Sequence, residues 1–330
     1  MRAFEYTSPT TRQQAVELLS GEAAVLAGGT DLLSLMKDDV VTPKRVVNIK
    51  DIRELNGAHY GPRGMQIGAL TSLGELADHP LVKQHYPAFA DALLEAASQQ
   101  IRNMATIGGN ICQRPRCWYF RSGFGLTPKT PDGKSLVEAG DNRYHAILGN
   151  DGPALFVSPS SVVPAMIAYG ARIRIAGPKG SREVALEKFF KIPQAEGERE
   201  HDLQPNEIVT DIFLPPPAGG RYAHYEVRQK ESFDWPLALA AVALHMNGNT
   251  VRSAQVVMGY VAPVPWVSEE AAQALVGKTV NEESAKTAGD AAVSKAKPLS
   301  HNSYKVQLAR VAVKRAILQA ARGKAEGGEA

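Results

Sequence analysis

Cysteine is the scarcest of the reactive residue types in this sequence. Cys112 and Cys117 are the only two among 330 residues, which is too few for a disulfide framework or for an iron–sulfur cluster held by four thiolates. The eight histidines show no H-x-x-x-H or H-E-x-x-H spacing, and no Ser/His/Asp or Cys/His arrangement stands out. The sequence therefore predicts no metal site and no catalytic acid, base or nucleophile.

Long apolar runs and concentrated charge are also absent. No run could span a bilayer, and the first twenty residues lack the apolar stretch and cleavage site of a signal peptide. The net charge of +3 is not gathered into a basic block. We therefore expect a cytoplasmic protein with no membrane insertion and no nucleic-acid partner. It would be periplasmic only if a partner that carries a signal exported it.

Two glycine pairs are the clearest local signals that are present. They stand in "AGGT" at 27–30 and in "TIGGN" at 106–110. A glycine lets the backbone approach a diphosphate closely, and exposed N–H groups at a turn attract that anion. The alternative is that each pair only makes a tight turn. Neither segment has the G-x-G-x-x-G spacing, which disfavours a Rossmann nicotinamide site.

The residues beside each glycine pair have expected roles of their own. We expect Asp31 to cap the helix that follows the first turn, with its carboxylate turned back onto the helix N–H groups. At the second turn, the Thr106 hydroxyl and the Asn110 amide are expected to add hydrogen-bond donors to those of the backbone.

The order of elements predicts two domains. The first half alternates β-like runs with helical runs, and residues from Cys112 to about Asn142 show no sustained period. "ARIRIAG" alternates cleanly and is followed by a turn, so the boundary is expected near Gly177. Beyond it, three strand-like runs precede helices expected at 268–277, 282–296 and 302–322, the order typical of an α+β domain.

Longer segments carry a family resemblance. "AGGTDLLSLMK" at 27–37 and "IRNMATIGGNICQRPRC" at 101–117 resemble the FAD-binding medium subunit of molybdenum hydroxylases, of the xanthine, aldehyde and carbon monoxide dehydrogenase type. The similarity continues through "IGAL", "LEKFF", "LQPNEIVTDIFLP" and "FDWPLALAAVAL", and so covers nearly the whole chain in order.

This resemblance implies an α+β fold with a two-part vanillyl-alcohol-oxidase-type FAD-binding domain. That domain is expected at 1–177, with subdomains at about 1–58 and 59–177. A carboxy-terminal domain with an antiparallel sheet and helices is expected at 178–322, followed by a frayed tail at 323–330.

The resemblance also implies a cofactor site. One segment would wrap the FAD diphosphate, the second would contact diphosphate and ribityl from the other side, and an apolar residue of a later strand would face the flavin ring. That last residue could instead be an ordinary strand core residue. The implied residues are Leu26, Ala27, Gly28, Gly29, Thr30, Asp31, Leu32, Leu33, Thr106, Ile107, Gly108, Gly109, Asn110, Ile147 and Val209.

The implied function is electron transfer within a complex. Electrons would leave a substrate at a molybdopterin in a large partner, cross iron–sulfur clusters in a small partner, reach FAD here and pass to a small-molecule or protein acceptor. A heterotrimer of these three subunits and a dimer of that heterotrimer are both compatible with this function. Some relatives of the aldehyde-oxidoreductase branch carry an extra four-iron cluster near "QRPRCWYFR", but only Cys117 matches a ligand position, so no cluster is expected.

Three residues depart from the family pattern at contact positions, namely Tyr119, Ser161 and Glu226. Two alternatives therefore stay open: a free-standing FAD-dependent oxidase, and a non-redox assembly module of the same fold.

Overall fold

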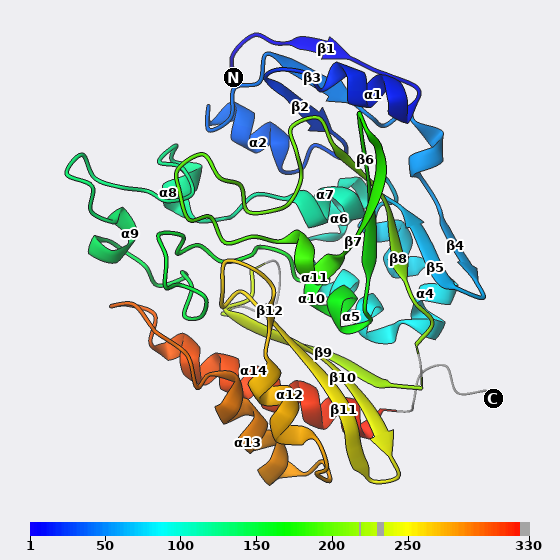
Figure 1. Cartoon of the computed structure of the whole chain (residues 1–330), viewed down its shortest axis with the longest axis vertical. Helices are drawn as coiled ribbons and strands as arrows, with labels where there is room; N and C mark the ends of the chain where they lie inside the picture. Colours follow the sequence, from blue (N-terminus) through cyan, green and yellow to red (C-terminus); the bar gives the residue numbers. More distant parts are fainter. Residues whose placement is uncertain (218, 230–233, 324–330) are drawn as a thin grey trace.

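Three separate β-sheets organise the chain (Figure 1). The computed structural model describes residues 1–217, 219–229 and 234–323. No helix within these ranges combines the length and the apolar character that crossing a bilayer requires. All but the first residue of the tail expected at 323–330 lies outside the described residues.

The first subdomain is a three-stranded parallel sheet in the order β1-β3-β2, covered by helices. Its helix α1 follows Thr11, a threonine with a Gln three positions later, which is a sequence pattern of helix starts; the Thr11 hydroxyl accepts a hydrogen bond from the Gln14 N–H at 3.2 Å. The loop after β2 contains the first glycine pair. The elements are β1 (Glu5–Thr7), α1 (Arg12–Leu18), β2 (Ala23–Leu26), α2 (Leu32–Lys37), β3 (Arg45–Asn48) and the 3-10 helix η1 (Arg53–Leu55).

The second subdomain is a five-stranded antiparallel sheet in the order β4-β5-β8-β6-β7. Helices pack beside it, and one of them, α7, begins at the second glycine turn. Its elements are β4 (Ala58–Gly61), β5 (Gly64–Gly68), α3 (Leu73–Asp78), α4 (Pro80–His85), α5 (Pro87–Glu95), α6 (Gln99–Met104), α7 (Ile107–Cys112), α10 (Val162–Ala168), β6 (Arg172–Gly177), β7 (Gly180–Ala185), α11 (Leu186–Phe189) and β8 (Ile208–Leu214).

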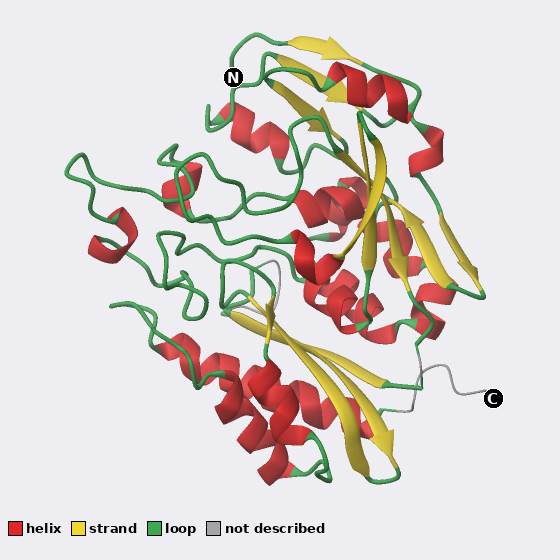
Figure 2. Ribbon diagram, in the orientation of Figure 1, coloured by secondary structure: helices red, strands yellow, loops and turns green. Residues whose placement is uncertain are grey.

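A long connection joins α7 to α10. As the sequence predicts, it is mostly irregular, with two short helices, α8 (Trp118–Arg121) and α9 (Leu136–Ala139). Figure 2 shows this segment as loops on one side of the molecule.

The boundary expected near Gly177 falls inside a sheet. Gly177 pairs with Gly180 in the β6–β7 hairpin, so the turn there is not a domain junction. Strand β8, which lies beyond the expected boundary, hydrogen-bonds with both β5 and β6. The first domain therefore continues to Leu214, because removing β8 would open the centre of its sheet.

The second domain is a four-stranded antiparallel sheet in the order β12-β11-β10-β9, with three helices packed against it (Figure 1). The helices lie close to the predicted ranges, at α12 (Glu269–Leu275), α13 (Glu282–Ala292) and α14 (Tyr304–Arg322). The strands are β9 (Arg221–Val227), β10 (Ala238–Asn247), β11 (Thr250–Gly259) and β12 (Trp266–Val267). The structure thus confirms the antiparallel sheet plus helices expected of this domain.

The three strand-like runs predicted beyond Gly177 are "EIVTDIFLP", "RYAHYEVRQ" and "VRSAQVVMGYVA". Strand β10 is not among them, and the burial of its two faces explains why. Ala240 and Val242 pack into the core shared with the three helices, whereas Ala241 and Ala243 pack into the core of the first domain. A strand buried on both faces shows no polar alternation. The same residues therefore join the two domains through a continuous apolar layer.

Candidate cofactor site

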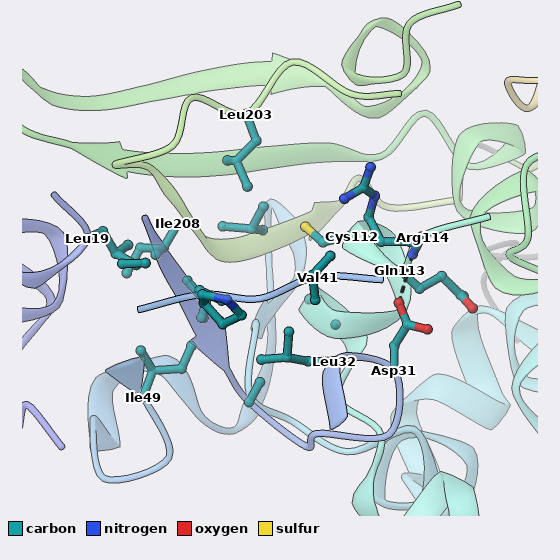
Figure 3. A pocket seen from close by; sticks show the side chains of 18 of the residues that line it. Leu19, Asp31, Leu32, Val41, Ile49, Cys112, Gln113, Arg114, Leu203 and Ile208 are labelled. Atoms are coloured by element: carbon teal, nitrogen blue, oxygen red, sulfur yellow. Dashed lines mark hydrogen bonds between the residues drawn. The ribbon is translucent and has the colours of Figure 1, made fainter. Parts of the chain in front are cut away.

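The two glycine turns line one cavity of about 500 Å³ between the two subdomains, which we call the central pocket. Figure 3 shows its apolar side chains: Leu203 lies on one side, Leu32 and Ile49 lie on the other, and the Cys112 sulfur lies between. Of the fifteen predicted cofactor residues, those that line the pocket are Ala27, Gly28, Gly29, Thr30, Asp31, Leu32, Thr106, Gly108, Gly109 and Val209.

The first glycine turn, Gly28–Leu32, presents unused donors. Its five consecutive backbone N–H groups make no hydrogen bond with any described residue, although all five residues line the pocket. Gly29 has φ of 76°, a left-handed conformation that favours glycine. A Cβ on Gly28 would collide with the backbone carbonyl of Met104. A row of free N–H groups at such a turn is a binding site for an anion.

The second glycine turn, Thr106–Asn110, is already satisfied by the protein. The Gly108 N–H donates to the Ala69 carbonyl at 2.9 Å, and the Gly109 N–H donates to the Thr106 hydroxyl oxygen at 3.1 Å. A Cβ on Gly108 would lie 2.8 Å from the Ala69 Cβ, so this glycine allows close backbone packing. The donors left at this turn are the Thr106 hydroxyl and the Asn110 amide, neither of which donates to a described residue.

Asp31 does not cap its helix. Its carboxylate makes no hydrogen bond with the N–H groups of α2, contrary to the prediction. Instead it accepts the backbone N–H of Arg114 at 2.8 Å and pairs with Arg116 at 2.9 Å and Arg121 at 2.7 Å. Figure 3 shows the bond to Arg114 as a dashed line. These contacts neutralise the acid beside the anion-binding turn and join that turn to the 112–121 segment.

Five predicted residues have side chains outside the pocket. Leu26 packs with Met36 and Val46, Leu33 is exposed, and Ile107 lies in the core of the second subdomain. Asn110 accepts a hydrogen bond from the Ser160 hydroxyl at 2.6 Å. Ile147 is fully buried in the core of the second domain, where its N–H donates to the Val261 carbonyl, so the geometry does not support a place for it at the cofactor.

The three departures from the family pattern also lie outside the central pocket. The Tyr119 hydroxyl donates to the Asp141 carbonyl at 3.3 Å, and the Ser161 hydroxyl lies 3.2 Å from that of Tyr260. The buried Glu226 carboxylate is held by His224 and Arg228, whose charges keep its pKa below the usual value against the opposing effect of burial. None of the three removes a group from the pocket wall.

Both cysteines are unreactive by their surroundings. Cys112 lines the pocket, and burial raises the pKa of its thiol to about 12. Cys117 lies 3.1 Å from His145 Nε2, and burial likewise raises its pKa. Burial therefore favours the protonated form of both thiols near neutral pH, which disfavours either as a nucleophile.

Arg114, Arg199, His201, Leu203 and Ile208 also line the pocket, and reasoning from the sequence did not assign them to it. Leu203 and Ile208 lie in "LQPNEIVTDIFLP", whose family resemblance was the available signal. Arg199 and His201 stand in the charged stretch "AEGEREHD", which is typical of an exposed loop and gives no such signal.

The groups that line the central pocket match the chemical parts of FAD. The first glycine turn offers free donors for a diphosphate, and the apolar side chains Leu19, Val41, Ile49, Leu203 and Ile208 offer walls for flat rings. The neutralised Asp31 removes the charge that would repel the diphosphate.

Comparisons with known proteins agree with this fit. Residues 2–217 match the family described as the FAD binding domain in molybdopterin dehydrogenase, and residues 223–320 match the CO dehydrogenase flavoprotein C-terminal domain. The chain is 31% identical to the aldehyde oxidoreductase FAD-binding subunit PaoB of Escherichia coli (94% of this chain, 96% of the relative). It is 30% identical to the carbon monoxide dehydrogenase medium chain of Hydrogenophaga pseudoflava (95% and 96%).

A solved structure gives the same result in three dimensions. Carbon monoxide dehydrogenase from Hydrogenophaga pseudoflava, in a form that lacks the Mo-pyranopterin moiety of its molybdenum cofactor, superimposes with a TM-score of 0.75 at 29% identity. The match covers 97% of this chain and 97% of that one.

Proposed function

This chain belongs to the FAD-binding medium subunits of the molybdenum hydroxylases, which are oxidoreductases, and from that premise we propose that it relays electrons from a partner's iron–sulfur clusters through FAD to an external acceptor. The observation that carries this proposal is the central pocket, in which a row of free backbone donors and an apolar wall face one space.

We assign the parts of the pocket as follows. The N–H groups of the first glycine turn hold the diphosphate, and the Thr106 hydroxyl donates to the phosphate and ribityl region. Val209 contributes an apolar surface to the flavin ring. Bound FAD supplies the redox chemistry, because its ring takes up two electrons and releases them singly or together.

The protein's own part is to bind, orient and exclude water. The lining includes no ionised thiol, and burial lowers the pKa of His201 to about 4, so that this side chain is neutral near pH 7. No proton-transfer group of the protein is needed for electron relay. A free-standing oxidase would instead need a base beside the ring.

Substrate oxidation belongs to partner subunits on this proposal. Within the described ranges, the potential metal ligands that cluster are Glu95, His224 and Glu226, and the Glu226 carboxylate is already bound by His224 and Arg228. Relatives named above are medium chains or FAD-binding subunits of larger enzymes. We therefore propose a complex with a large molybdopterin subunit and a small iron–sulfur subunit.

Two measurements test the function. The first is the visible absorbance of the purified full-length chain, with the flavin released by heat compared with FAD and FMN standards; we expect released FAD. The second is co-expression with the candidate large and small subunits, followed by stopped-flow observation of flavin reduction after substrate is added. Flavin that is reduced by substrate without those partners would support a free-standing oxidase, and a folded chain that binds no FAD alone or in the complex would support an assembly module.

A further inference from the structure

The charged side chains that line the central pocket are paired, with one exception. Glu22 pairs with Lys44, Glu207 with Arg182, Arg114 with Glu200, and Asp31 with Arg116 and Arg121. Arg199 forms no ion pair with any described residue, and its one hydrogen-bond contact among them joins Nη2 to His201 Nε2 at 3.5 Å. The pocket therefore holds one cation that forms no ion pair with a described residue.

The surroundings of Arg199 make an anionic ligand favourable. Arg199 lines the pocket and is solvent-exposed, and crowding by nearby protein and the Arg114 charge lower the pKa of its guanidinium, against the opposing effect of Glu200. His201 does not supply a countercharge, because it is neutral near pH 7. A guanidinium without an ion-pair partner gains from an anionic ligand that also accepts its hydrogen bonds.

The position of Arg199 relates it to both glycine turns. Its charge acts on the Cys112 thiol, at the end of the helix that the second turn begins. The neighbouring Arg114 holds Asp31 of the first turn through its backbone N–H. Arg199 thus lines the same pocket as both turns.

We propose that Arg199 is the charged partner of the FAD diphosphate. Its forked guanidinium binds phosphate oxygens while the first glycine turn donates backbone N–H groups to the same dianion. This inference rests on the proposed function, because it requires that the pocket holds FAD. It adds a phosphate-binding residue that lies about ninety positions along the chain from the second glycine turn and farther from the first.

The test compares ligands that carry different parts of FAD. Apoprotein of the full-length chain is titrated with FAD, with ADP, which contains the diphosphate, and with riboflavin, which has no phosphate. For Arg199→Gln we expect the affinities for FAD and ADP to fall by roughly tenfold to a hundredfold, the range measured for hydrogen bonds to charged groups. Riboflavin affinity should not change. Arg199→Lys should recover part of the loss, because it keeps the charge without the fork.

Control measurements separate this inference from general damage. Arg252→Gln removes the charge of an exposed arginine in the second domain that forms no ion pair with described residues, and its FAD affinity should equal that of wild type. Wild-type affinity for ADP should also fall more steeply with added salt than that of Arg199→Gln.

Each outcome bears on one proposal. FAD affinity of Arg199→Gln within twofold of wild type would overturn the role of Arg199, and so would an equal loss for riboflavin, which would place the side chain at the ring. Failure of wild-type chain to bind both FAD and ADP would instead overturn the proposed function.

Discussion

Asp31→Asn should destabilise the protein through the first glycine turn. The Asp31 carboxylate is the shared partner of Arg116 and Arg121, and the side chains of Asp31 and Arg121 are each only 17% exposed. Asparagine has nearly the same shape and can still accept the Arg114 N–H, so the substitution removes mainly the charge. Two guanidinium groups would then lie close together without their counterion.

The magnitude follows from the burial. Removing one partner of a buried ion pair costs about 3–5 kcal/mol. Arg121 keeps its hydrogen bonds to the carbonyls of Pro115 and Arg114, and Arg116 remains 28% exposed. We therefore expect the low end of that range, about 3 kcal/mol, or a fall in Tm of about 4 °C.

The assay is thermal unfolding of the full-length chain together with its flavin content. Asp51→Asn is the matched control, because Asp51 is exposed and forms no ion pair with described residues. The double variant Asp31→Asn/Arg121→Met should lose less stability than the sum of the two single variants, since each single change leaves the other charge unpaired. An Asp31→Asn protein as stable as Asp51→Asn, with full flavin content, would refute the reasoning.

Three further predictions concern the pocket and its surroundings. Gly109→Val should lose FAD with only a small fall in the Tm of the apoprotein, because a Cβ there meets a single tight neighbour, the Thr106 hydroxyl oxygen at 3.0 Å. Gly108→Ala should lower the apoprotein Tm more, through its contact with Ala69; equal Tm losses would contradict this contrast. Cys117→Ser should leave iron content and flavin absorbance unchanged, and a loss of iron on metal analysis would show that Cys117 binds a cluster after all. Burial lowers the pKa of His201 to about 4, so its neutral form stabilises the fold above the unfolded pKa of about 6.5, and this stability is lost as the pH falls toward 4. His201→Phe, which retains a ring to stack on Phe189, should therefore lose less stability between pH 6.5 and 4 in unfolding measurements; an unchanged pH dependence would show that His201 is not buried in its neutral form.

Local sequence was sufficient for the features that depend on neighbouring residues. The Thr11 cap of α1, the two glycine turns and the helices of the second domain follow from short-range hydrogen bonds and apolar periodicity, so they could be recognised without a fold. The family resemblance extended this to the architecture and the cofactor, because the order of motifs along the chain reflects a shared fold.

Strand pairing between distant segments could not be predicted from the local sequence. Strand β8 lies beyond the expected boundary at Gly177, and only its hydrogen bonds to β5 and β6 assign it to the first domain. Strand β10 shows no alternation because both of its faces are buried, a condition that other segments create.

The cofactor site shows most clearly the difference between features that follow from local sequence and features that depend on distant segments. The glycine pairs and the family resemblance of their flanking residues were enough to single out the two turns that line one pocket. Only the folded chain shows where the Asp31 carboxylate points and that Arg199 lines the pocket without an ion pair to a described residue. The physical reason is that a charge is defined by the groups within a few ångströms of it, and here those groups come from segments more than eighty residues away along the chain.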